Sequence, residues 1–242
     1  PIIIALVSCV LIVVLITIVL FPETKYIIDS SYRGDVIIST DGNFIAANSF
    51  EFFAFFSRSE NVPLWKTQPL FSFSIPFMAM APDGSYIGGS AWENTGGSWN
   101  YNIHFYKNSG EPMWSFSGTY FHSSSISSDG YYIALATSGG AYLFTRDDNI
   151  PIWSYFSGPE SRIVLSADGR YLAFVEGGDA FVLDRLENRE LQIRPEGALV
   201  NSLSMSSNGN SIVIGIAADG PTRESGFVYL YSLESQTPIW IY

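Results

Sequence analysis

Basic residues are scarce in this sequence. The 242 residues include 12 Lys and Arg against 23 Asp and Glu, which gives a formal net charge of −11 at pH 7. A protein that binds a phosphate backbone needs a clustered basic surface, and here the few basic residues are spread thinly along the chain. We therefore expect no nucleic acid as a partner.

Cysteine and histidine are nearly absent. The single cysteine, Cys9, excludes an intramolecular disulfide, and His104 and His122 are the only histidines. A zinc or copper site needs several converging His, Cys or carboxylate ligands, and no residue is spaced to pair with either histidine. The fold must therefore be stable without a disulfide, and neither histidine is predicted to bind a metal.

Two short acidic clusters lie beside expected turns, at Asp147-Asp148 and at Glu176 with Asp179. Calcium prefers carboxylate ligands, but solvated surface turns carry the same residues. The serines that precede the expected turns should hydrogen-bond to local backbone, and no Ser-His-Asp arrangement is indicated. We predict no catalytic residue, no metal site and no cofactor.

Charge is absent from the N-terminal run Ile2 to Leu20. These 19 residues would span about 28 Å as a helix, the thickness of a bilayer's hydrocarbon core, and Pro22 would end the helix. A cleaved signal peptide has a shorter apolar region that ends in a small-residue site, which is missing here. We predict a retained anchor over residues 1–22 and a linker over 23–32. The anchor residues are Ile2, Leu6, Val10, Val14, Ile18 and Phe21.

The run Leu6-Val7-Ser8-Cys9 resembles a bacterial lipobox, which would make Cys9 a lipidated N-terminus. The residues after Cys9 stay apolar where a lipoprotein would turn polar. We favour a small apolar cysteine within a membrane helix.

Turn dipeptides recur along the rest of the chain. Their glycines are spaced 42, 46, 39 and 40 residues apart, at Asp41-Gly42, Asp83-Gly84, Asp129-Gly130, Asp168-Gly169 and Asn208-Gly209. Asp-Gly and Asn-Gly are favoured in tight hairpins whose two central residues both take positive φ. Short apolar segments flank each dipeptide, so every repeat begins with a β-hairpin.

A second marker follows each turn at a nearly fixed distance. It reads Pro-x-Trp and ends at Trp65, Trp114, Trp153 and Trp240. The Trp follows the turn glycine by 23 residues in the first and third repeats, and Gln192 takes that place in the fourth. In the second and fifth repeats the distance is 30 and 31, with the extra residues at 92–100 and 218–225, where we expect surface loops. The Trp is predicted to be a packing wedge with one N–H to satisfy.

A repeat of about 40–45 residues with four strands is a β-propeller blade. We predict an all-β protein, a propeller of four-stranded blades with five visible repeats, preceded by one transmembrane helix. The blades are expected at about 33–69, 70–119, 120–158, 159–197 and 198–242. The propeller is either a five-bladed ring or one that continues past Tyr242 toward six to eight blades. We favour the second because Ile239 to Tyr242 reads like mid-protein sequence.

The repeats resemble two propeller families. The Asp-Gly hairpins resemble those of WD40-like propellers, and Ala141-Tyr142-Leu143-Phe144 running on to Ile152-Trp153-Ser154-Tyr155 resembles the repeat of quinoprotein-type (PQQ-like) propellers. Anchored propellers of this hybrid kind resemble archaeal and bacterial surface proteins, which implies a single-pass cell-membrane protein with an extracytoplasmic propeller. The quinoprotein resemblance also raises an enzyme hypothesis. Quinone-dependent dehydrogenases need an eight-bladed ring with a calcium ion and a catalytic Asp, which five repeats do not supply.

A non-catalytic role in binding other proteins is the prediction that these features favour. The chain would be a scaffold or an accessory subunit of a membrane or cell-surface complex. The alternative is a pilin-like subunit, with the apolar helix in a filament core and the propeller outside. The candidate partner contacts lie in the two insertions: Trp92, Trp99, Asn100, Tyr101, Arg223 and Glu224.

Overall fold

The computed structural model describes residues 35–48, 53–67, 78–95, 98–156, 162–194, 198–218, 226–234 and 237–242. All regular elements in these ranges are β-strands, and no helix there is long and apolar enough to cross a membrane. The predicted anchor over 1–22 and the linker over 23–32 lie outside the described residues. The described residues all belong to one compact unit, residues 33–242.

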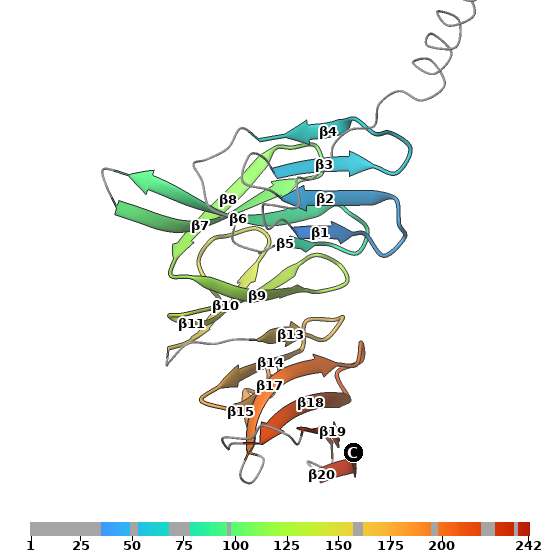
Figure 1. Ribbon diagram of the computed structural model, residues 1–242, viewed down its shortest axis with the longest axis vertical. Coiled ribbons are helices and arrows are strands. Elements are labelled where there is room, and N and C mark those ends of the chain that lie inside the picture. The colour runs from blue at the N-terminus through green and yellow to red at the C-terminus, as the bar shows by residue number, and fades with distance from the viewer. Residues whose placement is uncertain are drawn as a thin grey trace, which may run out of the picture. The chain divides into compact units, whose positions relative to one another are not determined.

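The described residues contain twenty strands, which form five antiparallel sheets of four consecutive strands each, so the predicted four-stranded blades are confirmed (Figure 1). Blade 1 contains β1 (Asp35–Ile38), β2 (Phe44–Asn48), β3 (Phe53–Ser57) and β4 (Pro63–Lys66). Blade 2 contains β5 (Met78–Met80), β6 (Tyr86–Thr95), β7 (Ser98–Lys107) and β8 (Pro112–Gly118). Blade 3 contains β9 (Phe121–Ile126), β10 (Tyr132–Thr137), β11 (Gly140–Thr145) and β12 (Trp153–Tyr155). Blade 4 contains β13 (Ile163–Leu165), β14 (Tyr171–Glu176), β15 (Asp179–Asp184) and β16 (Arg189–Ile193). Blade 5 contains β17 (Ala198–Met205), β18 (Ser211–Ala218), β19 (Gly226–Ser232) and β20 (Thr237–Ile241).

The recurring turn dipeptides join the first and second strands of every blade, but their geometry differs from the prediction. In blade 3 the Gly130 N–H donates to the Ser127 carbonyl, and Gly130 has φ +67°. Among the described residues only Asn188 has positive φ without being glycine, so the turn aspartates do not share the left-handed conformation. The prediction of a two-residue turn in which both central residues have positive φ is therefore wrong. The glycine follows a β-turn and alone needs the left-handed region.

In every blade except blade 2, where Ala81 takes its place, a serine two residues before the Asp or Asn of the dipeptide hydrogen-bonds to it. The Ser127 hydroxyl donates to Asp129 Oδ1 at 2.6 Å and accepts the Tyr132 N–H at 2.8 Å. The Tyr131 N–H also donates to Asp129 Oδ1, at 2.9 Å. These hydrogen bonds, that from Ser127 first, lower the pKa of the Asp129 carboxyl below its usual range. The same arrangement occurs at Ser39 with Asp41 and at Ser166 with Asp168.

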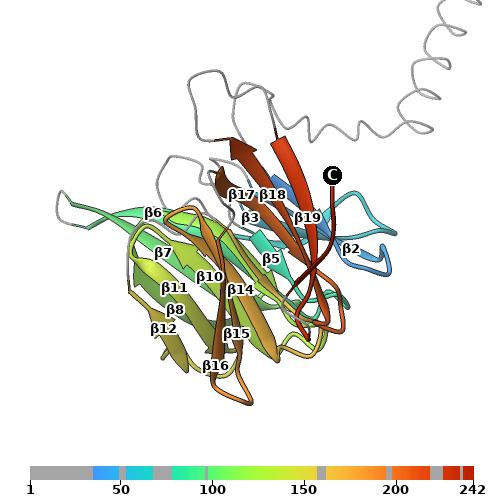
Figure 2. The ribbon, with the colours of Figure 1, turned by 90° about the horizontal axis from the view of Figure 1, so that it is seen from below.

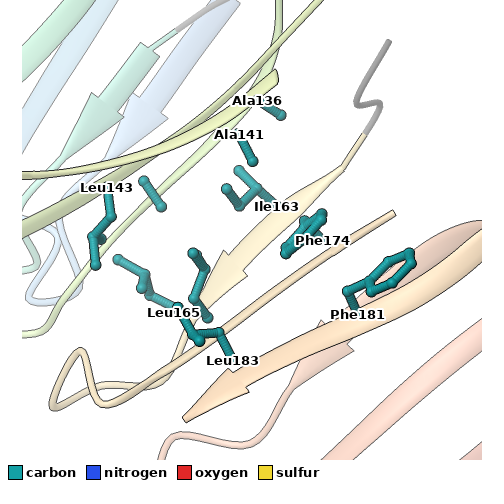
Figure 3. Packing of buried hydrophobic residues seen from close by; sticks show 10 residues of the cluster. Ala136, Ala141, Leu143, Ile163, Leu165, Phe174, Phe181 and Leu183 are labelled. Atoms are coloured by element: carbon teal, nitrogen blue, oxygen red, sulfur yellow. The ribbon is translucent and has the colours of Figure 1, made fainter. Parts of the chain in front are cut away.

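Four apolar clusters lie between consecutive blades. The cluster between blades 3 and 4 buries Ala134, Ala136, Ala141, Leu143, Ile163, Leu165, Leu172, Phe174, Phe181 and Leu183, and Figure 3 labels eight of them. Along β14, Leu172 and Phe174 face blade 3, whereas Ala173 and Val175 face blade 5. Both faces of an inner strand are buried, so it reads as a continuous apolar run.

The Pro-x-Trp tryptophans extend this packing to the outer strands. Trp65 stacks on Phe55 of its own blade, with ring centroids 5.7 Å apart, and its Nε1–H donates to the Asn108 carbonyl of blade 2 at 2.8 Å. Trp114 repeats the contact one blade further, donating to the Arg146 carbonyl at 2.7 Å. The predicted packing wedge with a satisfied N–H is confirmed in these two blades.

Blade 4 departs from the predicted alignment of this marker. Leu191, not Gln192, pairs with Val182 and packs in the cluster toward blade 5. In blades 1, 2 and 5 the pairing of the third and fourth strands shifts register next to the Trp, which adds one residue before it. In blade 4 the third and fourth strands pair without a shift, so counting residues from the turn glycine overshoots by one.

The turn glycines of blades 2 to 5 lie against an aromatic ring of the preceding blade, whereas Gly42 of blade 1 does not. A Gly→Ala substitution should therefore destabilise the protein by different amounts at these positions. A Cβ on Gly169 would collide with the Tyr132 ring, whereas a Cβ on Gly42 has no atom within 4 Å. Both glycines have left-handed φ, so Gly→Ala costs about 1–2 kcal/mol at either site. At Gly169 overpacking adds a further ~1–3 kcal/mol. We expect Gly169→Ala to lower the urea midpoint clearly more than Gly42→Ala, and equal shifts would contradict this contact.

Candidate protein-interaction surface

The insertion in blade 2 forms a long β-hairpin, where a surface loop over 92–100 was predicted. The strands β6 and β7 pair without a break from Tyr86 with Lys107 to Thr95 with Ser98. The prediction was wrong because the extra residues continue the ladder, which satisfies their backbone groups by pairing. The hairpin projects beyond the neighbouring strands in both views (Figures 1 and 2).

The hairpin brings the predicted contact residues of blade 2 together in register. Trp92 pairs with Tyr101, and Trp99 and Asn100 pair with Asn94 and Glu93. This register is that of the backbone, and it sets Trp92 directly across the ladder from Tyr101. The second predicted pair, Arg223 and Glu224, lies outside the described residues, in the connection between β18 and β19.

Tyr101 anchors a row of aromatic side chains at the base of the hairpin. Its ring lies 5.7 Å from that of Tyr120, which in turn lies 5.0 Å from the imidazole of His122. Burial, and to a lesser degree Tyr120, raises the pKa of the Tyr101 phenol. The row therefore links the hairpin of blade 2 to the start of β9 in blade 3. Sequence reasoning missed Tyr120 because it falls between two strands of different repeats.

The two histidines have different neighbours within the described blades. His122 Nε2 lies 2.9 Å from Ser138 Oγ, but no described carboxylate is hydrogen-bonded to the imidazole. Burial, and then the charge of Arg162, lower the pKa of His122, which favours the neutral ring. His104 packs against Tyr106, with ring centroids 6.4 Å apart. Among the described residues no group of three His, Cys, Asp or Glu could hold a metal ion.

The acidic clusters that suggested calcium have protein partners. Asp179 accepts hydrogen bonds from Arg194 Nη2 at 2.6 Å and from Gln192 Nε2 at 2.7 Å. Asp148 accepts the Ile150 N–H at 3.1 Å. These contacts make the clusters part of turn and strand structure. Arg194 was missed because it stands fifteen residues after Asp179 in sequence and meets it only across the sheet.

The sequence did not indicate the ion pair of Arg170 with Asp184. It is the most buried ion pair among the described residues. Asp184 is 3% exposed and accepts two hydrogen bonds from Arg170, from Nε at 3.0 Å and Nη2 at 2.7 Å. It also accepts the Leu186 and Glu187 N–H groups. The hydrogen bonds from Arg170 are the main reason that the pKa of Asp184 is lowered. The bidentate pair ties the turn of blade 4 to the end of β15.

Comparisons with known proteins bear on the fold. No protein-family model and no curated protein matches the sequence. The fold is similar to the crystal structure of the RRP9 WD40 repeats and to the structure of U3-55K, each with a TM-score of 0.62 at 14% identity over 86% of this chain. The described blades therefore have the WD40-type β-propeller fold. This chain spans 62% of the RRP9 chain and 63% of the U3-55K chain. These structures do not test the quinoprotein-type resemblance, which stays a prediction.

The buried ion pair predicts a pH-dependent loss of stability. Because the folded-state pKa of Asp184 is lowered, its contribution is fully present above its unfolded pKa of about 3.9 and is lost as pH falls through the folded value. Asp184→Asn should cost about 2 kcal/mol at pH 7 and flatten the decline of the urea midpoint between about pH 5 and pH 2.

The control is Asp147→Asn, because the Asp147 side chain is mostly exposed and pairs with Arg146 only at 3.7 Å. It should leave the stability at pH 7 nearly unchanged. An Asp184→Asn protein with the wild-type pH profile would contradict the assigned role of the pair.

Proposed function

We propose that this chain is a non-catalytic scaffold whose propeller binds other protein subunits. The observation that carries the proposal is the β6–β7 hairpin, which projects from blade 2 and bears Trp92, Trp99 and Tyr101. Aromatic residues are enriched in the cores of protein interfaces. The strands of the hairpin are already paired, so its backbone need not be ordered on binding. The partner surface begins at this hairpin and continues along Tyr120, which is 40% exposed.

The wider setting of the scaffold is proposed from the sequence. The uncharged run from Ile2 to Leu20 supports a membrane anchor, and the resemblance to anchored surface propellers supports an extracytoplasmic position. The chain would then be an accessory subunit of a membrane or cell-surface complex. A nucleic-acid partner would need a clustered basic surface. Several basic residues of the propeller instead contact rings of the protein itself, which supports a protein partner. Arg146 lies over Tyr86 and Arg185 over Tyr132, at 4.9 and 4.2 Å from the ring centroids.

The proposal is tested on the native particle, extracted in mild detergent and analysed by light scattering and mass spectrometry. We expect a discrete particle that contains this chain and other subunits. The double variant Trp92→Ser, Trp99→Ser should lose those subunits while its thermal unfolding stays that of the wild type. The matched control is Ile150→Ser, Ile152→Ser, which removes two exposed apolar side chains of blade 3 away from the hairpin.

Each outcome of this experiment is decisive. If the hairpin variant keeps all its subunits, the hairpin is not the partner surface. If the control variant loses the subunits too, general surface hydrophobicity holds the particle together. A large homopolymer that sediments without detergent would replace the scaffold by the filament arrangement, with the apolar N-terminal run in the core.

A further inference from the structure

The turn of blade 5 differs from the other four in one side chain. Blades 1 to 4 carry Asp-Gly there, whereas blade 5 carries Asn208-Gly209, which is also the only Asn-Gly pair among the 242 residues. The backbone nitrogen of the following residue can attack the side-chain amide of an asparagine and expel ammonia. Glycine favours this attack because it has no Cβ to hinder it. The dipeptide therefore carries a chemistry that the ionised aspartates of the other turns do not share.

The Asn208 side chain is held in the way that other turns hold an aspartate. Ser206 Oγ donates to Asn208 Oδ1 at 2.8 Å, and the Asn210 N–H donates to the same oxygen at 3.1 Å. The Ser211 N–H donates to Ser206 Oγ at 3.0 Å. Blade 3 has the same three hydrogen bonds around its aspartate. The turn therefore uses only Oδ1 of the amide, and Nδ2 has no hydrogen-bond partner among the described residues.

The backbone of the turn is restrained on both sides of this asparagine. The Gly209 N–H, which belongs to the nitrogen that would attack, donates to the Ser206 carbonyl at 2.9 Å. The Ser207 carbonyl, just before Asn208, accepts the Ala167 N–H of blade 4 at 2.8 Å. Closing a ring between the Gly209 nitrogen and the Asn208 side chain therefore requires the turn to open. An exposed turn opens at a lower free energy than the whole protein unfolds.

We propose that Asn208 is a site of spontaneous deamidation and that the hydrogen bonds of its own turn set the rate. In the open turn the Gly209 nitrogen bonds to Asn208 Cγ, the Cγ–Nδ2 bond breaks, and ammonia leaves with the proton of the Gly209 amide. Water then opens the resulting cyclic imide at one of its two carbonyl carbons. The product is either aspartate or isoaspartate, in which the main chain runs through Cβ and Cγ. Water is the only other reactant, and the inference is independent of the partner surface on the hairpin.

The two products should change the stability of blade 5 in opposite directions. Aspartate is the residue that the other four blades carry, and a carboxylate accepts the hydrogen bonds from Ser206 and Asn210 more strongly than an amide does. Isoaspartate adds one atom to the main chain inside the turn. Gly209 lies so close to Tyr171 of blade 4 that a Cβ would collide with the ring. The longer turn therefore disturbs the packing between blades 4 and 5.

The rate is measured by mass spectrometry on the full chain in mild detergent at neutral pH, once folded and once in urea. The tryptic peptide 190–223 contains Asn201, Asn208 and Asn210. Deamidation replaces NH by O, and fragmentation of the peptide assigns this mass change to one residue. Asn201 and Asn210 precede serine and are the internal controls. In urea Asn208 should convert well before either control, and in the folded chain its conversion should be slower by about tenfold or more.

Two serine variants separate opening of the turn from unfolding of the protein. Ser206→Ala removes the hydrogen bonds of this serine to Asn208 and Ser211, and it should speed the folded-state conversion at least about fivefold. The matched control is Ser127→Ala, which removes the same hydrogen bonds from the turn of blade 3. The two variants should lower the urea midpoint by similar amounts, yet Ser127→Ala should leave the conversion rate of Asn208 unchanged.

The effects of the two products are tested by urea unfolding. Asn208→Asp, which reproduces the aspartate product, should have a midpoint at or above that of the wild type. Chain that has deamidated during long storage is separated from the unmodified chain by ion exchange. It should show a second transition at lower urea, in proportion to its isoaspartate content. A clear loss of stability in Asn208→Asp would contradict the equivalence of this turn with the others.

Four results would overturn the proposal. Equal conversion rates in the folded and the unfolded chain would show that the turn does not restrain Asn208. A Ser206→Ala chain that reacts no faster than the wild type would exclude the hydrogen bonds of this serine as the restraint. Equal acceleration by Ser127→Ala would assign the rate to unfolding of the whole protein. A folded chain in which Asn201 or Asn210 reacts before Asn208 would remove the site.

Discussion

Packing between consecutive blades is the interaction on which the rest of the structure depends. Each blade is a single four-stranded sheet with two apolar faces, and a lone sheet cannot remove both faces from water. In β14 the residues alternate between a cluster shared with blade 3 and one shared with blade 5. The stability of any one blade is therefore inseparable from that of its neighbours, as in other repeat proteins.

The turn between the first two strands couples this packing to the backbone. Its glycine permits the left-handed residue and also leaves room for the aromatic ring of the preceding blade. In blades 1, 3 and 4 the serine and aspartate of the turn satisfy polar groups of the loop, and the N–H of the second turn residue donates to the next blade. A short motif thus fixes the hairpin, the spacing of the blades and the edge of the core together. This explains why the repeat is recognisable although its strands vary in sequence.

The same constraint separates structural from functional features. Trp65 and Trp114 are conspicuous in the sequence, yet their contacts lie within or between blades. Arg146 and Arg185 likewise lie over tyrosine rings of the preceding blade. The proposed partner surface, the β6–β7 hairpin, is an extension of blade 2 that the repeat does not require.

The sequence by itself determined the repeat, the four strands of each blade and the wedge role of the tryptophans. All three follow from local patterns, namely turn residues and alternating or continuous apolar runs, whose physical cause acts within a few residues. It did not determine the conformation of the turn aspartates, the strand character of residues 92–95 and 98–100, or the equivalence of Leu191 with the tryptophans. Those features depend on which hydrogen bonds and register the paired strand offers. The Arg170–Asp184 pair was likewise decided only by tertiary structure, because the two residues stand fourteen positions apart and meet only through the paired strands.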